Sequence, residues 1–305
     1  MARSGRGAAA PLLVTGGEAD FNLASLAARM EERGCPHRTV SVGAEGNPSV
    51  VWDLQADTLS VDGEAVHAAG AFVRHDVFTF LADRRQATAQ RASAWYATLA
   101  GWLFAHPEVR LLNRDANAPT NKPFHLHLAL RAGLEIPRTL VTNDRARLAA
   151  ESAVGPMVAK PVPGGGYCHP LEEVLAAAPE RDGRTASPAI VQNRLEPPEV
   201  RVYAVGGRYI PFAVRSDRLD YRTSNETRVE PLSLDTVPAP LLAGLGRLME
   251  RLGMDYGAAD FKTDPATGRL VFLELNSSPM FAAFDAASAY AVSDAIIDFL
   301  LGAGH

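Results

Sequence analysis

Two apolar segments separated by a turn sequence near the C-terminus constrain the fold of this chain more than any other feature. The segments contain "GAADF" and "FLELN", and they flank "TDPATG", whose proline and glycine suit a turn. The pattern predicts an antiparallel hairpin over residues 256–276. Alternation along the second strand places Glu274 and Asn276 on one face and Leu275 on the other. Antiparallel pairing would bring Asp260 beside Glu274.

The polar side chains of this hairpin suit a metal site. Carboxylate and carboxamide oxygens are ligands that Mg²⁺ prefers, and three of them leave positions for phosphate and water. A buried pair of carboxylates also needs a cation or a proton, because an uncompensated charge is costly in apolar surroundings. We therefore predict Asp260, Glu274 and Asn276 as ligands of Mg²⁺. The alternative is a polar strand end whose groups are satisfied by the neighbouring backbone.

Composition excludes several classes of protein. The chain has 305 residues, 47% of them hydrophobic and 21% charged, which is typical of a soluble globular protein with room for two or three packed units. A net charge of -5 provides no basic surface for nucleic acid or for an anionic membrane. Cys35 and Cys168 are too few for a disulfide framework or a cysteine-based zinc site. We read the N-terminus as a leader that enters a first strand, and we find no apolar run of transmembrane length, so we expect a cytoplasmic protein.

The order of the predicted elements indicates an α/β (α+β) protein. The first hundred or so residues read as β-α-β-β-β-α, with a bend at Asp62-Gly63. A helix follows "NAPTN", because Pro123 suits its first turn and Gly133 suits its end. Beyond it we expect a hairpin folded at Gly206-Gly207, the amphipathic helix "APLLAGLGRLMERLG" and a closing helix, "AVSDAIIDFLLG".

Two lysines are candidates for binding phosphate. Lys160 ends the apolar strand "MVAK" and precedes "PGGGY", whose backbone N–H groups would close over phosphates. The Gly-Lys-Ser/Thr order of a Walker-type loop is missing, and a lysine that extends to water is the alternative. Lys122 lies at a helix start, where a cation is unfavourable unless an anion is present.

Several charged side chains are candidates for contacts with substrate or phosphoryl oxygens. Arg201, Arg215 and Arg222 are spread over the central hairpin and the segment after it, and arginine forks match such oxygens. Ordinary surface arginines are the alternative. In "FVRHDVF", Arg74 and Asp76 would share one strand face and either meet a zwitterionic substrate or pair within the protein. His125 and His127 are two apart on a helix, so they face different ways and cannot share a metal.

The order of these motifs resembles the ATP-grasp superfamily, and within it the RimK-like and microviridin-type (graspetide) ligases. The resemblance begins near Asn113 with "NKPFHLHLALRAGLEIPRTLVTND", which looks like the segment leading into the ATP-binding unit. "VAKPVPGGGY" looks like the strand, lysine and phosphate-covering loop. "IVQNRLEPPEVRVYAVGGRYIPFAVRS" is similar to the hinge strand with its strand pair, and "YGAADF…LVFLELNSSP" to the magnesium hairpin.

The resemblance implies an ATP-grasp fold, in which two α+β subdomains enclose ATP. Its division of the chain would be an N-terminal pre-ATP-grasp α/β domain (1–112), a central subdomain with the phosphate-covering loop (113–192) and a C-terminal subdomain with the magnesium hairpin (193–305). The ATP-binding set that it implies consists of Lys122, Lys160, Gly164, Gly165, Gly166, Gln192, Asn193, Arg194, Leu195 and Glu199. Within this set, residues 193–195 would bind adenine and Glu199 would bind the ribose.

The resemblance also implies the remaining roles. Asp260, Glu274 and Asn276 would bind Mg²⁺. Arg215 would lie by the transferred phosphoryl group, and Arg222 would help to hold the substrate. Arg201, Arg74 and Asp76 are weaker substrate candidates. ATP and Mg²⁺ are the implied cofactors, and a homo-oligomer fits the resemblance because related ligases commonly form dimers or tetramers.

The activity implied is that of an ADP-forming carboxylate–amine ligase, which activates a carboxylate as an acyl phosphate and joins it to an amine of an amino acid or peptide. A graspetide-type macrocyclase that forms side-chain esters or amides is one alternative, and a nucleotide-binding regulatory module without turnover is another. The chain departs from the graspetide pattern in two places. "SSPMFAAFD" follows Asn276, where those ligases tend to carry Pro-Asn-Gly-Gln, and a single Arg74 stands where they often carry paired arginines.

Overall fold

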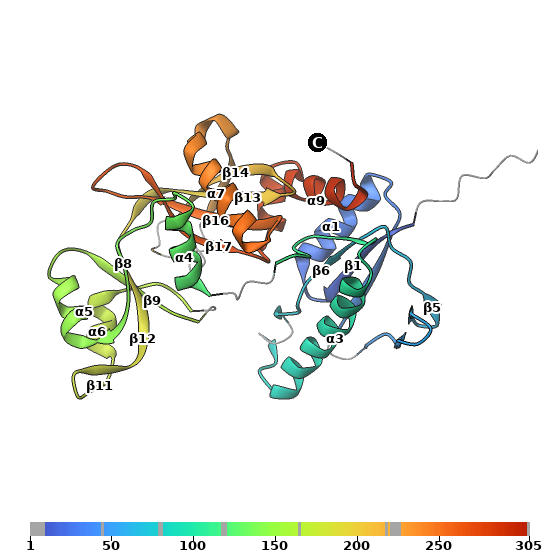
Figure 1. The fold of residues 1–305 in the computed structure, drawn as a ribbon, viewed down its shortest axis with the longest axis horizontal. Coiled ribbons are helices and arrows are strands. Elements are labelled where there is room, and N and C mark those ends of the chain that lie inside the picture. The colour runs from blue at the N-terminus through green and yellow to red at the C-terminus, as the bar shows by residue number, and fades with distance from the viewer. Residues whose placement is uncertain are drawn as a thin grey trace, which may run out of the picture. The chain divides into compact units, whose positions relative to one another are not determined.

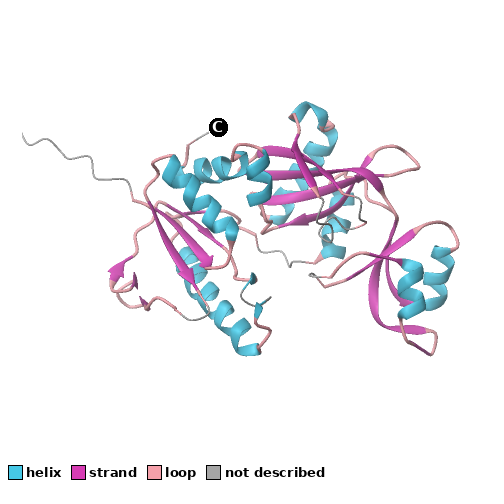
Figure 2. Ribbon diagram, turned by 180° about the vertical axis from the view of Figure 1, so that it is seen from behind, coloured by secondary structure: helices cyan, strands magenta, loops and turns pink. Residues whose placement is uncertain are grey.

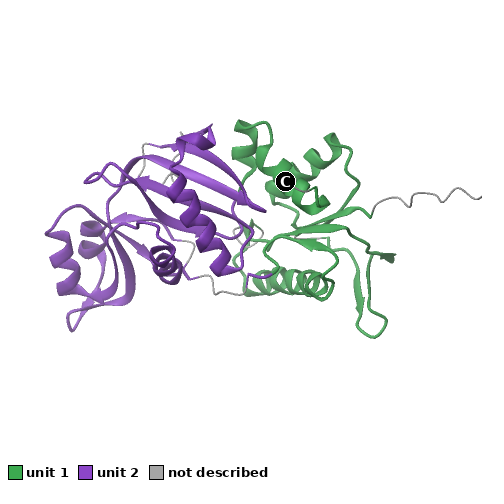
Figure 3. Ribbon diagram, turned by 45° about the horizontal axis from the view of Figure 1, so that its top comes forward, with its two compact units in different colours: residues 1–114, 280–305 green, residues 115–279 purple. Residues whose placement is uncertain are grey.

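The computed structural model describes residues 10–43, 46–78, 82–116, 121–163, 166–216, 219 and 227–303. It divides into two compact units (Figure 3). Unit 1 combines Met1–Arg114 with Met280–His305, and unit 2 is Asp115–Pro279. In the described part of the chain, no helix combines the length and the apolar character needed to cross a membrane.

Unit 1 is built on a parallel sheet in the order β2-β1-β6-β7. Its strands are β1 (Leu12–Gly17), β2 (His37–Val42), β6 (Gly70–Val73) and β7 (Arg110–Leu111). Its helices are α1 (Phe21–Glu32), α3 (Gln86–Ala105), α8 (Ala282–Ala287) and α9 (Ala291–Leu301). Helix α3 covers one face of the sheet through Leu99 and Leu103, which pack against Leu13 and Ala71. Helices α1 and α9 cover the other face (Figure 1).

A small antiparallel sheet completes unit 1. Its strands are β3 (Val50–Asp53), β4 (Thr58–Val61) and β5 (Glu64–Ala65). The turn between β4 and β5 has φ of +52° at Asp62 and +78° at Gly63, which confirms the predicted bend. The sequence did not predict β2, because only its second half alternates between buried and partly buried side chains.

The first half of unit 2 is a five-stranded sheet covered by two short helices (Figure 2). Its strands are β8 (Thr139–Asp144), β9 (Met157–Pro161), β10 (His169–Pro170), β11 (Glu180–Arg181) and β12 (Arg184–Asn193). Its helices are α5 (Arg145–Ser152) and α6 (Leu171–Ala177). Leu148 and Leu171 from these helices pack on Ala159 and Val191 of the sheet. The Asp144 carboxylate caps α5 by accepting from Arg147 N at 3.0 Å.

The second half of unit 2 is an antiparallel sheet in the order β15-β14-β13-β16-β17. Its strands are β13 (Glu196–Val205), β14 (Arg208–Arg215), β15 (Arg228–Pro231), β16 (Tyr256–Thr263) and β17 (Leu270–Asn276). One face packs on α4 (Lys122–Arg131) and α7 (Ala239–Leu252), and a 3-10 turn, η2 (Leu234–Thr236), precedes α7. Gly206 and Gly207 both have positive φ, so the predicted turn between β13 and β14 is confirmed.

The C-terminal segment belongs to unit 1, whereas the sequence grouped it with residues 193–305. The reason is a side chain far away in sequence. Asn22 Oδ1, which is buried, accepts hydrogen bonds from Phe281 N at 2.7 Å and Ala282 N at 3.0 Å, so it caps the start of α8. Arg29 of α1 also donates to Asp294 of α9, at 2.8 Å for each of two bonds.

Candidate active site

The predicted pairing of the C-terminal hairpin is confirmed. Asp260 of β16 lies opposite Glu274 of β17, and Ala258 lies opposite Asn276. The Asn276 side-chain amide donates to Asp260 Oδ2 at 3.3 Å and to Glu274 Oε1 at 3.4 Å. The three predicted metal ligands therefore converge on one face of the sheet.

A β-bulge gives this face its polar character. Asp260 pairs with Glu274, but the next residue, Phe261, pairs with Phe272, so Leu273 is an extra residue in β17. Strict alternation would place Phe272 on the same face as Glu274. The bulge turns Phe272 instead into the apolar core, where its ring lies 5.7 Å from that of Phe261. Glu274 and Asn276 stay on the polar face.

Two lysines of unit 2 lie beside this cluster. Lys122 Nζ is 2.8 Å from Glu274 Oε2. Lys122 is the first residue of α4, which Asn121 caps by accepting from Phe124 N at 2.9 Å. Glu274 thus supplies the anion that a cation needs at a helix N-terminus. Lys160, on β9, is half-buried and interacts electrostatically with Glu274 and Lys122.

The charges at this site perturb one another. Burial lowers the pKa of Lys160, and the carboxylate of Glu274 opposes that effect. Burial acts to raise the pKa of Glu274, but the ammonium groups of Lys122 and Lys160 outweigh it, so this pKa lies below the usual glutamate value. Glu274 is therefore ionised at neutral pH and attracts cations.

Strand β13 adds a second row of charges. Glu199 lies opposite Lys262 of β16, and Arg201 lies opposite Asp260. Lys262 Nζ is 3.1 Å from Glu199 Oε2, and Arg201 Nε is 3.6 Å from Asp260 Oδ1. All four residues are buried. The sequence-based set missed Lys262, although its place two residues after Asp260 on an apolar strand was a usable signal.

The segment predicted to bind adenine is partly engaged within unit 2. Gln192 is buried, and its amide donates to Thr139 Oγ1 at 3.0 Å. The N–H groups of Asn193 and Arg194 donate to the carbonyls of residues 138 and 156, at 3.3 and 2.9 Å. Leu195 is buried. Adenine binding by this segment stays a prediction. Backbone groups other than the N–H groups of Asn193 and Arg194 would have to make the contacts.

The remaining predicted residues of unit 2 are only partly described. Arg215 ends β14, is exposed, and donates from Nε to Glu230 Oε2 at 2.9 Å. Gly166 lies so close to β9 that a Cβ there would approach Pro161 Cγ to 2.5 Å. Gly164, Gly165 and Arg222 lie outside the described residues.

The residues present fit a magnesium–nucleotide complex. Among the described residues, no group of three or more His, Cys, Asp and Glu side chains is arranged to hold a metal. Two carboxylates and one amide form an incomplete set, which suits Mg²⁺ because this ion commonly fills its octahedron with phosphate oxygens and water. Lys122 and Lys160 would supply positive charge for those phosphates.

Comparison with known proteins gives a match to solved structures. No protein-family model matches the sequence, and no curated protein is significantly similar to it. The ATP-grasp ligase PsnB, complexed with a minimal precursor, is 25% identical with a TM-score of 0.75, and the match covers 97% of this chain and 99% of that one. PsnB complexed with minimal precursor, Mg and ADP is 26% identical with a TM-score of 0.73, and the match covers 95% of this chain and 97% of that one.

Two further solved structures share the fold. The macrocyclase MdnC from Microcystis aeruginosa MRC, bound with precursor peptide MdnA, is 20% identical with a TM-score of 0.70, over 95% of this chain and 99% of that one. The VanG D-Ala:D-Ser ligase from Enterococcus faecalis is 14% identical with a TM-score of 0.58, and the match covers 97% of this chain and 99% of that one.

The chain is an ATP-grasp ligase. The fold and the family expected from the sequence are confirmed, and the match runs through both units. The predicted cofactors, ATP and Mg²⁺, agree with the Mg, ADP and AMPPNP present in the PsnB complexes. The roles of individual residues in this ligase stay predictions.

One expectation about unit 1 of the ligase was wrong. Strand β6 ends at Val73, so Arg74 and Asp76 do not share a strand face. Arg74 Nε donates to Asp20 Oδ2 at 2.7 Å, and both residues are buried. Asp76 Oδ1 accepts from Phe78 N at 3.1 Å, so Asp76 lies in the loop that follows the strand. Of the two alternatives left open for Arg74, pairing within the protein is the one observed.

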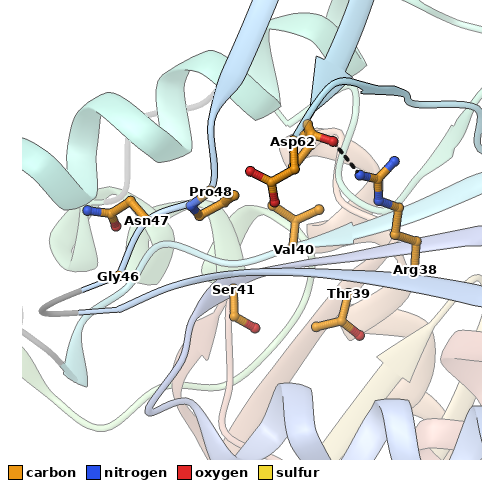
Figure 4. Close-up of a pocket in the computed structure, with 9 residues that line it drawn as sticks. Arg38, Thr39, Val40, Ser41, Gly46, Asn47, Pro48 and Asp62 are labelled. Carbon is orange, nitrogen blue, oxygen red and sulfur yellow. Dashed lines mark hydrogen bonds between the residues drawn. The ribbon is translucent and has the colours of Figure 1, made fainter.

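Unit 1 also contains a pocket of about 500 Å³ beside the edge strand β2 (Figure 4). Arg38, Thr39 and Ser41 of β2 line it together with Asn47 and Asp62, and the Arg38 side chain extends toward Asp62. The Arg38 guanidinium donates to the Val61 carbonyl at 2.7 Å. None of the predicted nucleotide or metal residues lines this pocket.

Proposed function

We propose that this ATP-grasp ligase uses ATP and Mg²⁺ to join a carboxyl group of a peptide to an amine or hydroxyl of the same peptide, releasing ADP and phosphate. The match to PsnB carries the proposal, because it extends over nearly the full length of both chains, at 25–26% identity, and PsnB is complexed with a precursor. The macrocyclase MdnC shares the same fold. The proposal favours the macrocyclase alternative over a ligase of free amino acids.

The charges of unit 2 suit this chemistry. A carboxylate oxygen of the substrate would attack the γ-phosphorus of ATP, forming an O–P bond as the bond to ADP breaks. The amine or hydroxyl would then attack the acyl carbon and lose its proton, and phosphate would leave. Such phosphoryl transfer depends mainly on charge neutralisation and positioning, which Lys122 and Lys160 provide.

Asp260, Glu274 and Asn276 would hold Mg²⁺ in the proposed site. When bound, the ion would neutralise phosphate oxygens and orient them for transfer. The lowered pKa of Glu274 keeps this ligand ionised over the neutral range. Because ATP is the proposed co-substrate, we place the reaction in the cytoplasm.

Product analysis tests the proposal. The ligase would be incubated with Mg²⁺, ATP and either pooled free amino acids or pooled peptides that contain Asp or Glu together with Ser, Thr or Lys. We expect ADP and phosphate with certain peptides, and loss of one water per bond in their mass spectra. Glu274→Gln, which keeps the shape but removes the charge, is the control and should abolish both signals.

Other results would change the assignment. Turnover with free amino acids but with none of the peptides would instead indicate an intermolecular carboxylate–amine ligase. Formation of AMP and pyrophosphate would refute the acyl-phosphate route. Binding of ATP without turnover in every pool would favour a regulatory nucleotide-binding module.

A further inference from the structure

Lys262 is a buried cation to which the predicted set assigns no role. Only 8% of its surface is exposed, and lysine is rarely buried unless it is paired. Its Nζ atom lies 3.1 Å from Glu199 Oε2 and donates to the Leu219 carbonyl at 3.5 Å. Glu199 is itself buried and is the residue predicted to bind the ribose of ATP.

The sequence "EPPE" sets up this pair. The register between β13 and β16 shifts between Glu196 and Glu199, so Pro197 and Pro198 stand outside the regular ladder. Proline has no backbone N–H to donate, and an irregularity is therefore expected at this point in a sheet. After the shift, Glu199 falls opposite Lys262.

Lys262 is also adjacent to the metal cluster. It is two residues from Asp260 on β16, so both side chains lie on the same face of the sheet. On β13 the partners of these residues, Glu199 and Arg201, are likewise two apart. Each acidic side chain of this patch thus faces a basic one across the strands. Lys262 lies on the ribose side of the patch and Asp260 on the metal side.

The pairing has a physical consequence for Glu199. A buried carboxylate stays ionised only where a cation or several hydrogen bonds compensate its charge. An ionised carboxylate accepts hydrogen bonds through both oxygens, whereas a protonated one is also a donor. Recognition of two neighbouring hydroxyl groups needs a carboxylate held in one orientation, and the ammonium of Lys262, 3.1 Å from Glu199 Oε2, fixes that orientation.

We propose that Lys262 is a positioning residue for the nucleotide: its ammonium group holds the Glu199 carboxylate in one orientation as the acceptor for the ribose hydroxyls of ATP. The inference rests on the proposed use of ATP and on the predicted ribose role of Glu199. It adds a coupling between two residues on neighbouring strands. Lys262 acts through Glu199 and needs no contact with the nucleotide.

Nucleotide binding tests the coupling without turnover. Calorimetry in Mg²⁺ would compare AMPPNP with its 2′-deoxy form, for the wild type, Lys262→Met, Glu199→Gln and the double variant. A hydrogen bond to a charged group corresponds to a preference for the ribose form of about tenfold or more. We expect Lys262→Met to lose most of that preference while it binds the deoxy form with nearly unchanged affinity. The double variant should be no worse than Glu199→Gln, because coupled residues are not additive.

Two further variants separate a specific role from a structural one. Lys262→Arg retains the charge and should recover part of the preference. Arg269→Met removes an exposed cation of the same hairpin, which pairs with Glu135, and should leave the preference unchanged. Melting temperatures of all variants identify any loss of folding.

The outcomes are distinct. If Lys262→Met keeps the wild-type preference, or weakens both nucleotides equally, the coupling is refuted. A wild type that does not distinguish the two nucleotides also refutes it, because Glu199 would then not bind the 2′-hydroxyl. If the wild type binds neither nucleotide, the proposed use of ATP fails as well. If the wild type prefers the ribose form, Lys262→Met loses that preference, and no peptide is turned over, only the proposed function is contradicted.

Discussion

Replacing Arg74 by methionine should destabilise unit 1 strongly. Arg74 Nε donates to Asp20 Oδ2 at 2.7 Å, and the side chains are 4% and 0% exposed. Removing one partner of a buried ion pair leaves an uncompensated charge, which costs about 3–5 kcal/mol. Asp20 Oδ1 keeps its hydrogen bonds from Asn22 N and Nδ2, at 2.9 and 2.7 Å, so we expect the lower end, about 3 kcal/mol.

Thermal unfolding followed by calorimetry measures this loss. For a protein of this size, each kcal/mol corresponds to roughly 2–4 °C, so the transition of unit 1 should fall by about 6–12 °C. Arg85→Met is a matched control in the same unit, because Arg85 pairs with Asp83 at the surface, and its transition should not move measurably. Adding Asp20→Asn to Arg74→Met should recover part of the loss, since it removes the buried charge.

A fall of less than about 2 °C for Arg74→Met would refute this reasoning. Water would then screen the pair, and Arg74 would be available to a substrate. A double variant no more stable than Arg74→Met would show that the lost packing of the arginine stem, and not the buried charge, is the main cost.

Three further predictions concern the active site and the packing of unit 1. Burial lowers the pKa of Lys160 below 10.5, so ATP affinity should fall as pH rises through that lowered value, and protons should be taken up on binding. Lys160→Arg should flatten this dependence of ATP affinity on pH. Calorimetry in buffers of different ionisation enthalpy measures the proton uptake. The pKa of Glu274 is lowered below 4.5, so the stability that its ionised form contributes should be present above pH 4.5 and be lost as pH falls through the lowered pKa. The free energy of unfolding, measured from about pH 5 to pH 2, should therefore depend less on acid in Glu274→Gln. In Gly70→Ala, the new Cβ would approach the Leu300 carbonyl oxygen to 2.6 Å, which should cost about 1–3 kcal/mol by denaturant unfolding, whereas Gly155→Ala meets nothing within 4 Å and should cost far less.

The sequence predicted those features that local patterns determine. Alternation around the turn "TDPATG" fixed the pairing of Asp260 with Glu274. The glycines at 206 and 207 marked a turn that needs positive φ, and Pro123 marked the first turn of α4. These signals lie within a few residues of the structure that they specify, so no tertiary contact was needed to read them.

Features that depend on distant partners could not be read in this way. The bulge at Leu273 follows from the need of Phe272 for the core, which alternation alone does not reveal. The pairing of Arg74 with Asp20 joins residues 54 apart, and the strand expected to include Arg74 and Asp76 ends at Val73. The pairing of Lys262 with Glu199 could not be read because it joins two strands, although the place of Lys262 two residues after Asp260 was visible in the sequence.

The discontinuity of unit 1 has a practical consequence for protein engineering. Unit 2 is inserted between Arg114 and Met280, so a chimera with a related ligase must exchange Asp115–Pro279 as a cassette with two junctions. A fragment that stops at Arg114 would lack α9, which packs on β6 and β7, and should not fold by itself. For the same reason, a deletion at the C-terminus would unfold the part of the protein that begins at the N-terminus, and would leave unit 2 with its own core.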